Sequence, residues 1–200
     1  MTDSSKPKGT LLQPPLTEET VRSLQLGQTV FLSGVIYTFR DAQHMRAAEF
    51  LERGEELPVD LGDQVIYHAG PAFTRDGSEV TLFTAGPTTS ARNNMYAPQL
   101  LRELKFRAMV GKGGMDEATL EAMKEVGCVY LLVPSISAVL TTKVKGVREV
   151  YWEDLLGEAI FGIEVAEFGP LVVAMTADGE SMFEQVTASA RARLAASSQA

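Results

Sequence analysis

Residues 116–133 read DEATLEAMKEVGCVYLLV, and this stretch decides the fold class. Asp116 is a typical N-cap residue, an acidic residue follows it in the first turn, and Gly127 can end the helix in a left-handed conformation. The residues that follow, Cys128–Val133, form an apolar run, which predicts a strand in the middle of a sheet that is covered on both faces. A helix that leads directly into a buried strand is typical of α/β proteins.

The same alternation extends to both sides of this stretch. The patterns predict strands at residues 29–37, 64–71, 80–85, 108–110, 147–151, 162–165 and 171–175, and further helices at 17–24, 41–53, 94–103, 137–142 and 181–194. Thr17 is expected to be the N-cap of the first helix. In the helix at 41–53, Met45, Ala48 and Leu51 are expected to share one face. We therefore expect a mixed α/β fold, with residues 1–10 as a disordered tail and residues 11–195 as a single domain.

Composition limits the classes of function. The chain has 200 residues, a formal net charge of -8 and 45% hydrophobic residues, so it can bury an ordinary core, and its acidity argues against nucleic acid as a partner. No apolar run is long enough to span a bilayer, and residues 1–8 lack the apolar stretch of a secretory signal. The single cysteine, Cys128, excludes an internal disulfide and a metal cage built from several thiolates. We expect a cytoplasmic protein with a packed, inert thiol.

Two loops carry residues that suit an anion. Residues 85–92 (AGPTTSAR) place Thr88, Thr89 and Ser90 beside Arg92, and residues 111–114 (GKGG) place Lys112 between glycines. Hydroxyls, glycine-exposed backbone N–H groups and fixed cations together predict a pocket for a small carboxylate ligand. The alternatives are a polar turn that caps the next helix and a flexible turn with a solvated lysine. The second loop lacks the spacing of a Walker phosphate-binding loop.

A third candidate group lies where a predicted strand meets a predicted helix. Arg40 could bind a carboxylate, while Asp41 and His44 could orient it or relay protons. The alternative is that Asp41 is the N-cap of the helix and His44 lies on the surface. His68 is expected to be half-buried, with its hydrogen bonds satisfied.

Several blocks of the sequence, taken in order, resemble one family. They are residues 32–44 (LSGVIYTFRDAQH), 54–58 (GEELP), 65–71 (VIYHAGP), 86–90 (GPTTS), 111–115 (GKGGM) and 167–171 (EFGPL). The family is that of the β subunit, or C-terminal domain, of iron–sulfur hydro-lyases, namely class I fumarate hydratase and L(+)-tartrate dehydratase. The resemblance runs from about Leu12 to Phe183 and implies a swivelling β/β/α domain with a mixed sheet and flanking helices.

The resemblance also implies a partner and a reaction. A separate α subunit would hold a four-iron cluster through three cysteines, so this chain would hold no metal and supply half of an active site in an (αβ)2 assembly. The leading expectation is reversible hydration of fumarate to malate, a step of the tricarboxylic acid cycle. The alternatives are the β subunit of L(+)-tartrate dehydratase and a non-catalytic anion-binding or assembly subunit.

The roles that the resemblance implies fall on the three groups above. Substrate binding would use Arg40, Thr88, Thr89, Ser90, the backbone of Ala91, Arg92 and Lys112, and the catalytic set would be Thr88, Arg40, Asp41 and His44. Thr88 aligns with the proposed base of such fumarases, and its hydroxyl would need a close cation such as Arg40 to hold an alkoxide. Two departures from the family pattern lie near the expected site and bear on which substrate it takes. The family usually reads Gly-Arg-Met after Thr-Thr-Ser, whereas this chain has Ala91-Arg92-Asn93-Asn94. Residues 134–138 (PSISA) stand where fumarases often carry Gly-Gly-Ala.

Overall fold

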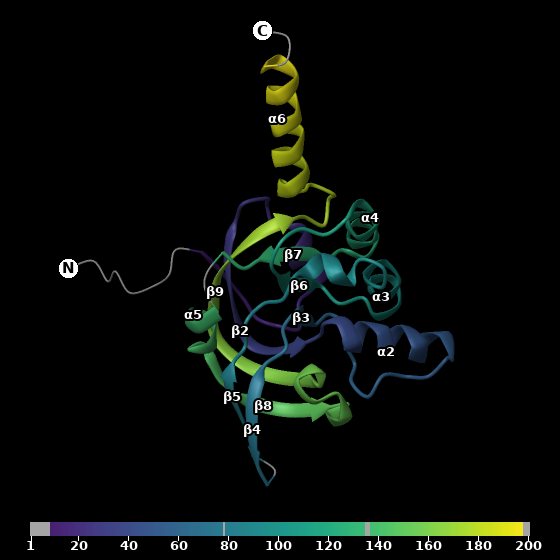
Figure 1. Ribbon diagram of the computed structural model, residues 1–200, viewed down its shortest axis with the longest axis vertical. Coiled ribbons are helices and arrows are strands. Elements are labelled where there is room, and N and C mark those ends of the chain that lie inside the picture. The colour runs from purple at the N-terminus through teal and green to yellow at the C-terminus, as the bar shows by residue number, and fades with distance from the viewer. Residues whose placement is uncertain (1–8, 78, 135–136, 198–200) are drawn as a thin grey trace, which may run out of the picture.

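The computed structural model describes residues 9–77, 79–134 and 137–197 (Figure 1). The strands are β1 (Thr10–Leu12), β2 (Thr29–Thr38), β3 (Val65–Tyr67), β4 (Ala72–Asp76), β5 (Glu79–Thr84), β6 (Ala108–Gly111), β7 (Val129–Leu132), β8 (Val144–Tyr151) and β9 (Ile160–Met175). The α-helices are α1 (Glu18–Arg22), α2 (Asp41–Glu52), α3 (Ala97–Leu104), α4 (Glu117–Val126), α5 (Ser137–Thr141) and α6 (Met182–Ser197), and the 3₁₀ helices are η1 (Ser90–Asn93) and η2 (Glu153–Glu158).

Within the described residues, seven strands form one mixed sheet in the order β1-β2-β3-β6-β7-β9-β8. Strands β2, β3, β6 and β7 run parallel to one another, and the long strand β9 runs antiparallel to both β2 and β7. Because β9 pairs with both of these strands, the sheet closes on itself. Strands β4 and β5 form a separate hairpin, which projects from the body of the molecule (Figure 1). The prediction of a mixed α/β fold is confirmed.

The closed sheet has an apolar core on each of its faces. Val30, Leu32 and Ile36 of β2 are buried in the cluster that also contains alternate residues of β9. The neighbouring Tyr37 belongs to a second cluster, which is formed with residues of α2, α3 and α4. Figure 1 shows these three helices on one side of the sheet. This alternation follows from the two-residue period of strands.

Predicted caps hold two of the helices in place. The side chain of Thr17 accepts a hydrogen bond from the backbone N–H of Thr20 at 3.1 Å, and that of Asp116 accepts one from Thr119 at 3.0 Å. Gly127 follows α4 in the left-handed region, with φ 73°. Both predicted N-caps and the predicted glycine stop are therefore confirmed.

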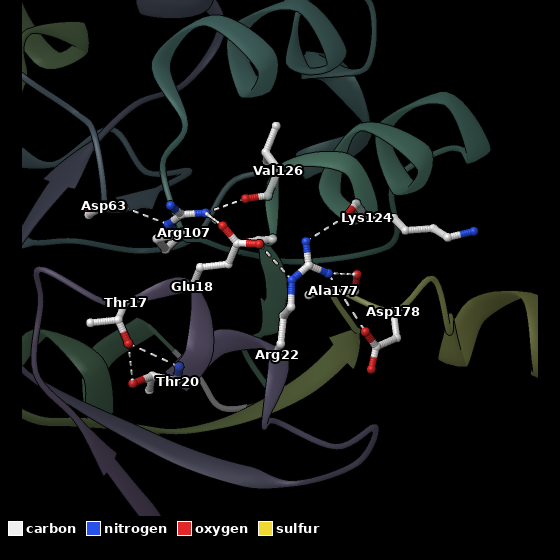
Figure 2. A network of polar contacts seen from close by, with 11 residues as sticks. Thr17, Glu18, Thr20, Arg22, Asp63, Arg107, Lys124, Val126, Ala177 and Asp178 are labelled. Atoms are coloured by element: carbon white, nitrogen blue, oxygen red, sulfur yellow. Dashed lines mark hydrogen bonds and ion pairs between the residues drawn. The ribbon is translucent and has the colours of Figure 1, made fainter.

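Two arginines bind the carboxyl-terminal end of α4 (Figure 2). Arg107 donates to the carbonyl of Val126 and pairs with Asp63 at 2.7 Å. Arg22 donates to the carbonyl of Lys124 at 3.2 Å and pairs with Glu18 at 2.8 Å. Cations at this end of a helix satisfy carbonyls without helical partners and oppose the helix dipole.

Other predictions need correction. The segments 162–165 and 171–175 belong to one strand, β9, and β4 was missed. The helix at 41–53 exists, but its buried residues are Gln43, His44, Ala47 and Ala48, while Met45 is 47% exposed. The N-cap residue of α2 is Arg40, so the interpretation of Asp41 as the N-cap is wrong.

The helix predicted at 181–194 is present as α6, and none of its residues is buried. It extends from the body at the end opposite to the β4–β5 hairpin (Figure 1). Within the part of the chain that the structure describes, every helix is too short or too polar to cross a membrane.

Candidate functional site

The site is assembled from the loops that follow β2, β3, β5 and β6. Strands β2, β3 and β6 are parallel neighbours, so their carboxyl ends meet at the same edge of the sheet. Isolated bridges then join Ala69 to Pro87 and Thr89 to Lys112. The loops predicted from sequence to bind an anion are therefore neighbours in space.

Thr88 is fixed by the chain that follows β3. Both its backbone N–H and its hydroxyl donate to the carbonyl of His68, at 2.6 Å and 2.9 Å. Its own carbonyl accepts a hydrogen bond from the N–H of Lys112 at 3.4 Å. Because a carbonyl only accepts, the hydroxyl proton of Thr88 points to His68, and the oxygen lone pairs remain available to accept.

Ser90 lies deeper than the threonines before it. Its Oγ is 2.8 Å from Nδ1 of His68 and 2.8 Å from the hydroxyl of Tyr130, and all three side chains are buried. A Cβ atom on Gly111 would overlap Ser90 Oγ, so a residue without a side chain is needed there. In contrast, Thr89 and Lys112 are exposed.

Arg40 and Arg92 converge on one carboxylate. Asp41 Oδ2 forms an ion pair with Nη2 of Arg92 and lies 3.9 Å from Nη2 of Arg40. The side chain of Arg92 is 56% exposed, whereas that of Arg40 is 20% exposed. The two guanidinium groups are thus close enough to bind the two ends of a small dicarboxylate.

Glu158 is a site residue that the sequence analysis missed. Its Oε1 lies 3.2 Å from Nη2 of Arg40, and its Oε2 accepts from the backbone N–H of Ala42 at 2.9 Å. It therefore supplies the side-chain acceptor at the start of α2 that was expected from Asp41. No local signal could have revealed it, because residue 158 lies 116 positions after Ala42.

The two histidines of the chain meet beneath this surface. Both are fully buried, and their ring centroids are 5.4 Å apart. His44 lies 2.8 Å from the carbonyl of Arg40 through Nδ1, so Nδ1 carries the proton and Nε2 is unprotonated. The interpretations of His44 as a surface residue and of His68 as half-buried with its hydrogen bonds satisfied are wrong, because both are buried and neither Nε2 atom has a hydrogen-bond partner.

Burial keeps both imidazoles neutral. It lowers the pKa of His44 to about 4, against a smaller opposing effect of the hydrogen bond to Arg40. It also lowers the pKa of His68 well below its ordinary value, and the neighbouring His44 adds to that effect. At neutral pH the positive charge of the site therefore comes from the arginines and Lys112.

Unsatisfied buried polar atoms are concentrated in this one region. Over the described ranges, the buried side-chain nitrogen and oxygen atoms without a partner are Arg40 Nε, Asp41 Oδ1, His44 Nε2, His68 Nε2, both amide atoms of Asn93, and Asn94 Oδ1. Folded proteins normally satisfy such atoms, and the exceptions occur where a ligand or water binds. Asn93 and Asn94 were noted from sequence as departures from the family pattern, and they lie in this unsatisfied set.

The donors at this site suit a carboxylate better than a metal ion. Cationic and hydroxyl groups predominate, and the described part of the chain contains no group of three His, Cys, Asp or Glu residues placed to hold a metal. The only cysteine, Cys128, is buried, and burial raises the pKa of its thiol. This chain alone therefore lacks the thiolates that a four-iron cluster requires.

Comparison with known proteins identifies relatives over almost the whole chain. The model of the family described as fumarase C-terminus matches residues 2–186. A Methanocaldococcus jannaschii protein, provisionally named L(+)-tartrate dehydratase subunit beta, is 42% identical over 174 residues, which are 86% of this chain and 89% of that protein. The L(+)-tartrate dehydratase subunit beta of Escherichia coli is 30% identical over 177 residues, covering 88% of this chain and 87% of that protein.

A third relative is much longer than this chain. A Geobacillus stearothermophilus protein, provisionally named class I fumarate hydratase, is 36% identical over 197 residues. The match covers 92% of this chain but 35% of that protein, so this chain corresponds to about a third of it. The named relatives are hydro-lyases or subunits of them. The chain belongs to the fumarase C-terminus family, which includes β subunits of L(+)-tartrate dehydratase and the corresponding part of class I fumarate hydratase.

Proposed function

We propose that this chain is the β subunit of a two-subunit hydro-lyase and that it supplies the carboxylate-binding half of the active site. The observation that carries the proposal is the convergence of Arg40 and Arg92 on Asp41, next to the loop of Thr88. The carboxylate of Asp41 marks the position that a substrate carboxylate would take between the two arginines. A four-carbon dicarboxylate is the ligand class that such a pair of guanidinium groups favours.

The residues of this chain would bind and orient the substrate. Arg40, Arg92 and Lys112 would hold the carboxylates and stabilise the charge that builds on one of them when the neighbouring C–H proton leaves. Thr89 and the backbone of Ala91 would line the anion, while Ser90 would hold this loop from below through its buried hydrogen bonds. Removing one such charged contact typically raises the activation free energy by about 2–4 kcal/mol.

Thr88 would act as the base that removes this C–H proton. A threonine hydroxyl is too weak an acid to ionise unaided, so the role requires a cation beside it. Its bonds to the carbonyl of His68 hold the side chain in a single orientation at the edge of the site. Asp41 and His44 would tune the site, Asp41 through its ion pair with Arg92 and His44 through its hydrogen bond to the backbone of Arg40.

The partner would be an α subunit that holds a four-iron cluster, and the complete enzyme would be a cytoplasmic (αβ)2 assembly. The cluster would supply a Lewis acid for the departing hydroxyl group. Fumarate and malate are our leading substrate pair. L(+)-tartrate is the second candidate, because the relatives from M. jannaschii and E. coli that align over most of their own length carry that name. We also propose that this domain is the swivelling β/β/α domain of the family.

The test is co-expression with an α subunit that carries the three cluster cysteines, followed by anaerobic assays on malate, fumarate and L(+)-tartrate. We expect hydro-lyase activity on one of these substrates only when both chains are present. Activity of this chain by itself would overturn the proposal. A complex that turns over none of the three would favour the non-catalytic alternative.

A further inference from the structure

The side chain of Arg40 lies in a narrow slot between two loops. A Cβ atom added to Gly70 would overlap Nη1 of Arg40 and would lie 3.1 Å from both Arg40 Cδ and the carbonyl of Gly157. Gly70 follows β3, and Gly157 belongs to η2, so the slot is formed by segments that are far apart in sequence. The guanidinium of Arg40 can occupy this position only because residue 70 is a glycine and has no side chain.

One carboxylate closes the end of this slot. Glu158 contacts the guanidinium of Arg40 through one oxygen, at 3.2 Å, and the N–H of Ala42 through the other, at 2.9 Å. It thus links the Arg40 side chain to the first turn of the helix that Arg40 precedes. The side chain of Glu158 is 30% exposed, so solvent only partly screens this pair.

The segment that carries Glu158 is itself held firmly. Asp154 forms two hydrogen bonds with Arg46 of α2, at 2.8 Å and 2.6 Å. Within η2, Leu156 has φ 53° and ψ -118°, a conformation that a residue with a side chain adopts at a cost. Strained backbone of this kind is found where a structure must place one group accurately.

We propose that Glu158 is a positioning residue that fixes the guanidinium of Arg40 for a substrate carboxylate. This inference rests on the proposed function. Glu158 contacts only Nη2, whereas Nε of Arg40 is buried without a partner, so the guanidinium keeps donors for a ligand. Without Glu158, the nearest anion is Asp41, 3.9 Å away, and the long side chain of Arg40 is free to turn towards it.

The first test compares Glu158→Gln with a matched control, Glu153→Gln. Both variants neutralise an acid of η2 that pairs with an arginine. The partner of Glu153 is Arg75 of β4, at 3.0 Å, and Arg75 is not a residue of the site. Glu158 uses a separate oxygen for Arg40 and for the N–H of Ala42, whereas Gln has one acceptor oxygen and would turn a donor NH2 group towards one of these two donors. In the complex with the cluster-bearing subunit, we expect kcat/KM to fall at least about tenfold for Glu158→Gln and to stay within about twofold for Glu153→Gln.

A double-mutant cycle separates positioning from general stability. If Glu158 acts through Arg40, then Glu158→Gln has little further effect in an Arg40→Ala background, and kcat/KM stays within about twofold of the single Arg40→Ala variant. A full additional loss in that background would overturn the proposal. So would near-normal kcat/KM for Glu158→Gln alone.

A readout without catalysis distinguishes this proposal from the proposed function. We would follow the guanidinium NMR signals of Arg40 in the purified chain while adding L-malate. Malate should shift these signals in the wild-type protein and in Glu153→Gln, but weakly in Glu158→Gln. Equal shifts in all three proteins would overturn the proposal. If the assembled enzyme is inactive while this pattern is observed, the proposed reaction fails and the role of Glu158 stands.

Discussion

At the scale of single residues, the site combines exposed cations with a buried layer that holds them. Asp41 links Arg40 and Arg92, while Ser90 links the outer loop to His68 and Tyr130. The exposed residues could be recognised from their chemistry alone. The supporting hydrogen bonds could not, because they join residues that are 22 and 40 positions apart.

Removing the hydroxyl of Ser90 should destabilise the fold. Ser90→Ala leaves the buried polar atoms of His68 and Tyr130 without their shared partner, and we expect a loss of about 1–3 kcal/mol in the free energy of unfolding. Thr89→Ala is the matched control, because Thr89 is exposed and adjacent. Denaturant unfolding measures both variants. Equal stability of the two would mean that the buried contacts of Ser90 contribute nothing.

The buried histidines should make the protein sensitive to acid. The unfolded chain protonates its histidines near pH 6.5, whereas the pKa of His44 in the folded protein is about 4. Between these values the unfolded state binds more protons, so the free energy of unfolding decreases as the pH falls, by an amount on the order of 3 kcal/mol for His44. Stability is retained above pH 6.5.

Chemical denaturation at several pH values measures this slope. The window from pH 6.5 to 4.5 is the informative one, because exposed carboxylates titrate mainly below it. A His44→Gln variant should show a shallower slope than the wild-type protein. An identical slope would show that His44 is not held neutral in the native state.

At the scale of elements, the sequence predicted what local chemistry controls. The caps at Thr17 and Asp116, the glycine stop of α4 and the buried strand β7 are all confirmed. Each depends on residues within about one helical turn or one strand. The two loops expected to bind one anion are also neighbours, since an isolated bridge joins Thr89 to Lys112.

Elements that depend on distant contacts could not be predicted. Strand β9 continues through Glu167 and Gly169, at φ 49° and 155°, because its pairing with β2 shifts register there. In the sequence pattern, this irregular stretch looks like a break between two strands. The exposed Met45 was likewise misplaced, since Gln43 and His44 occupy the buried face of α2 for their polar contacts.

Arg107 and Arg102 both contact α4 and should differ in their effect on stability. The side chain of Arg107 is 13% exposed, and it donates to the carbonyl of Val126 and to Asp63. Arg107→Ala should therefore cost about 2 kcal/mol of unfolding free energy. Arg102→Ala should cost less than about 1 kcal/mol, because its pair with Glu125 lies at the surface with the arginine 44% exposed.

Thermal and denaturant unfolding of the two variants provides the comparison. Residues 102 and 107 lie outside the candidate site, so the unfolding free energies of the two variants can be compared without a change in the site loops. A larger loss for Arg102→Ala than for Arg107→Ala would contradict the role assigned to the network in Figure 2.

At the scale of the whole molecule, the site lies where β2, β3 and β6 of the closed sheet end. Most of α6 extends away from the sheet (Figure 1). The formal net charge is -8, so an anionic ligand is attracted by the local group of cations and not by the field of the whole chain. The family match ends at residue 186, near the start of α6. The shared fold and the candidate site therefore lie before most of this helix.

Shortening α6 should leave the folded domain intact. None of its residues is buried, although Phe183 in its first turn packs against Tyr130, with ring centroids 6.3 Å apart. Removal of residues 188–200 should shift the midpoint of thermal unfolding by no more than about 2 °C. Phe183→Ala should lower the midpoint further, because it removes an aromatic contact with the core. A large loss on truncation would show that α6 stabilises the domain.

The most direct test of the account is the effect of Arg92→Ala on kcat/KM in the complex with the cluster-bearing subunit, measured on the preferred dicarboxylate. Arg92 is more than half exposed, so its removal should not unfold the domain. We expect a fall of about 30- to 1,000-fold, corresponding to the roughly 2–4 kcal/mol of one charged contact in the transition state, with an unchanged melting temperature. Near-normal turnover by a stable Arg92→Ala complex would contradict the claim that these loops form a cationic site for a dicarboxylate.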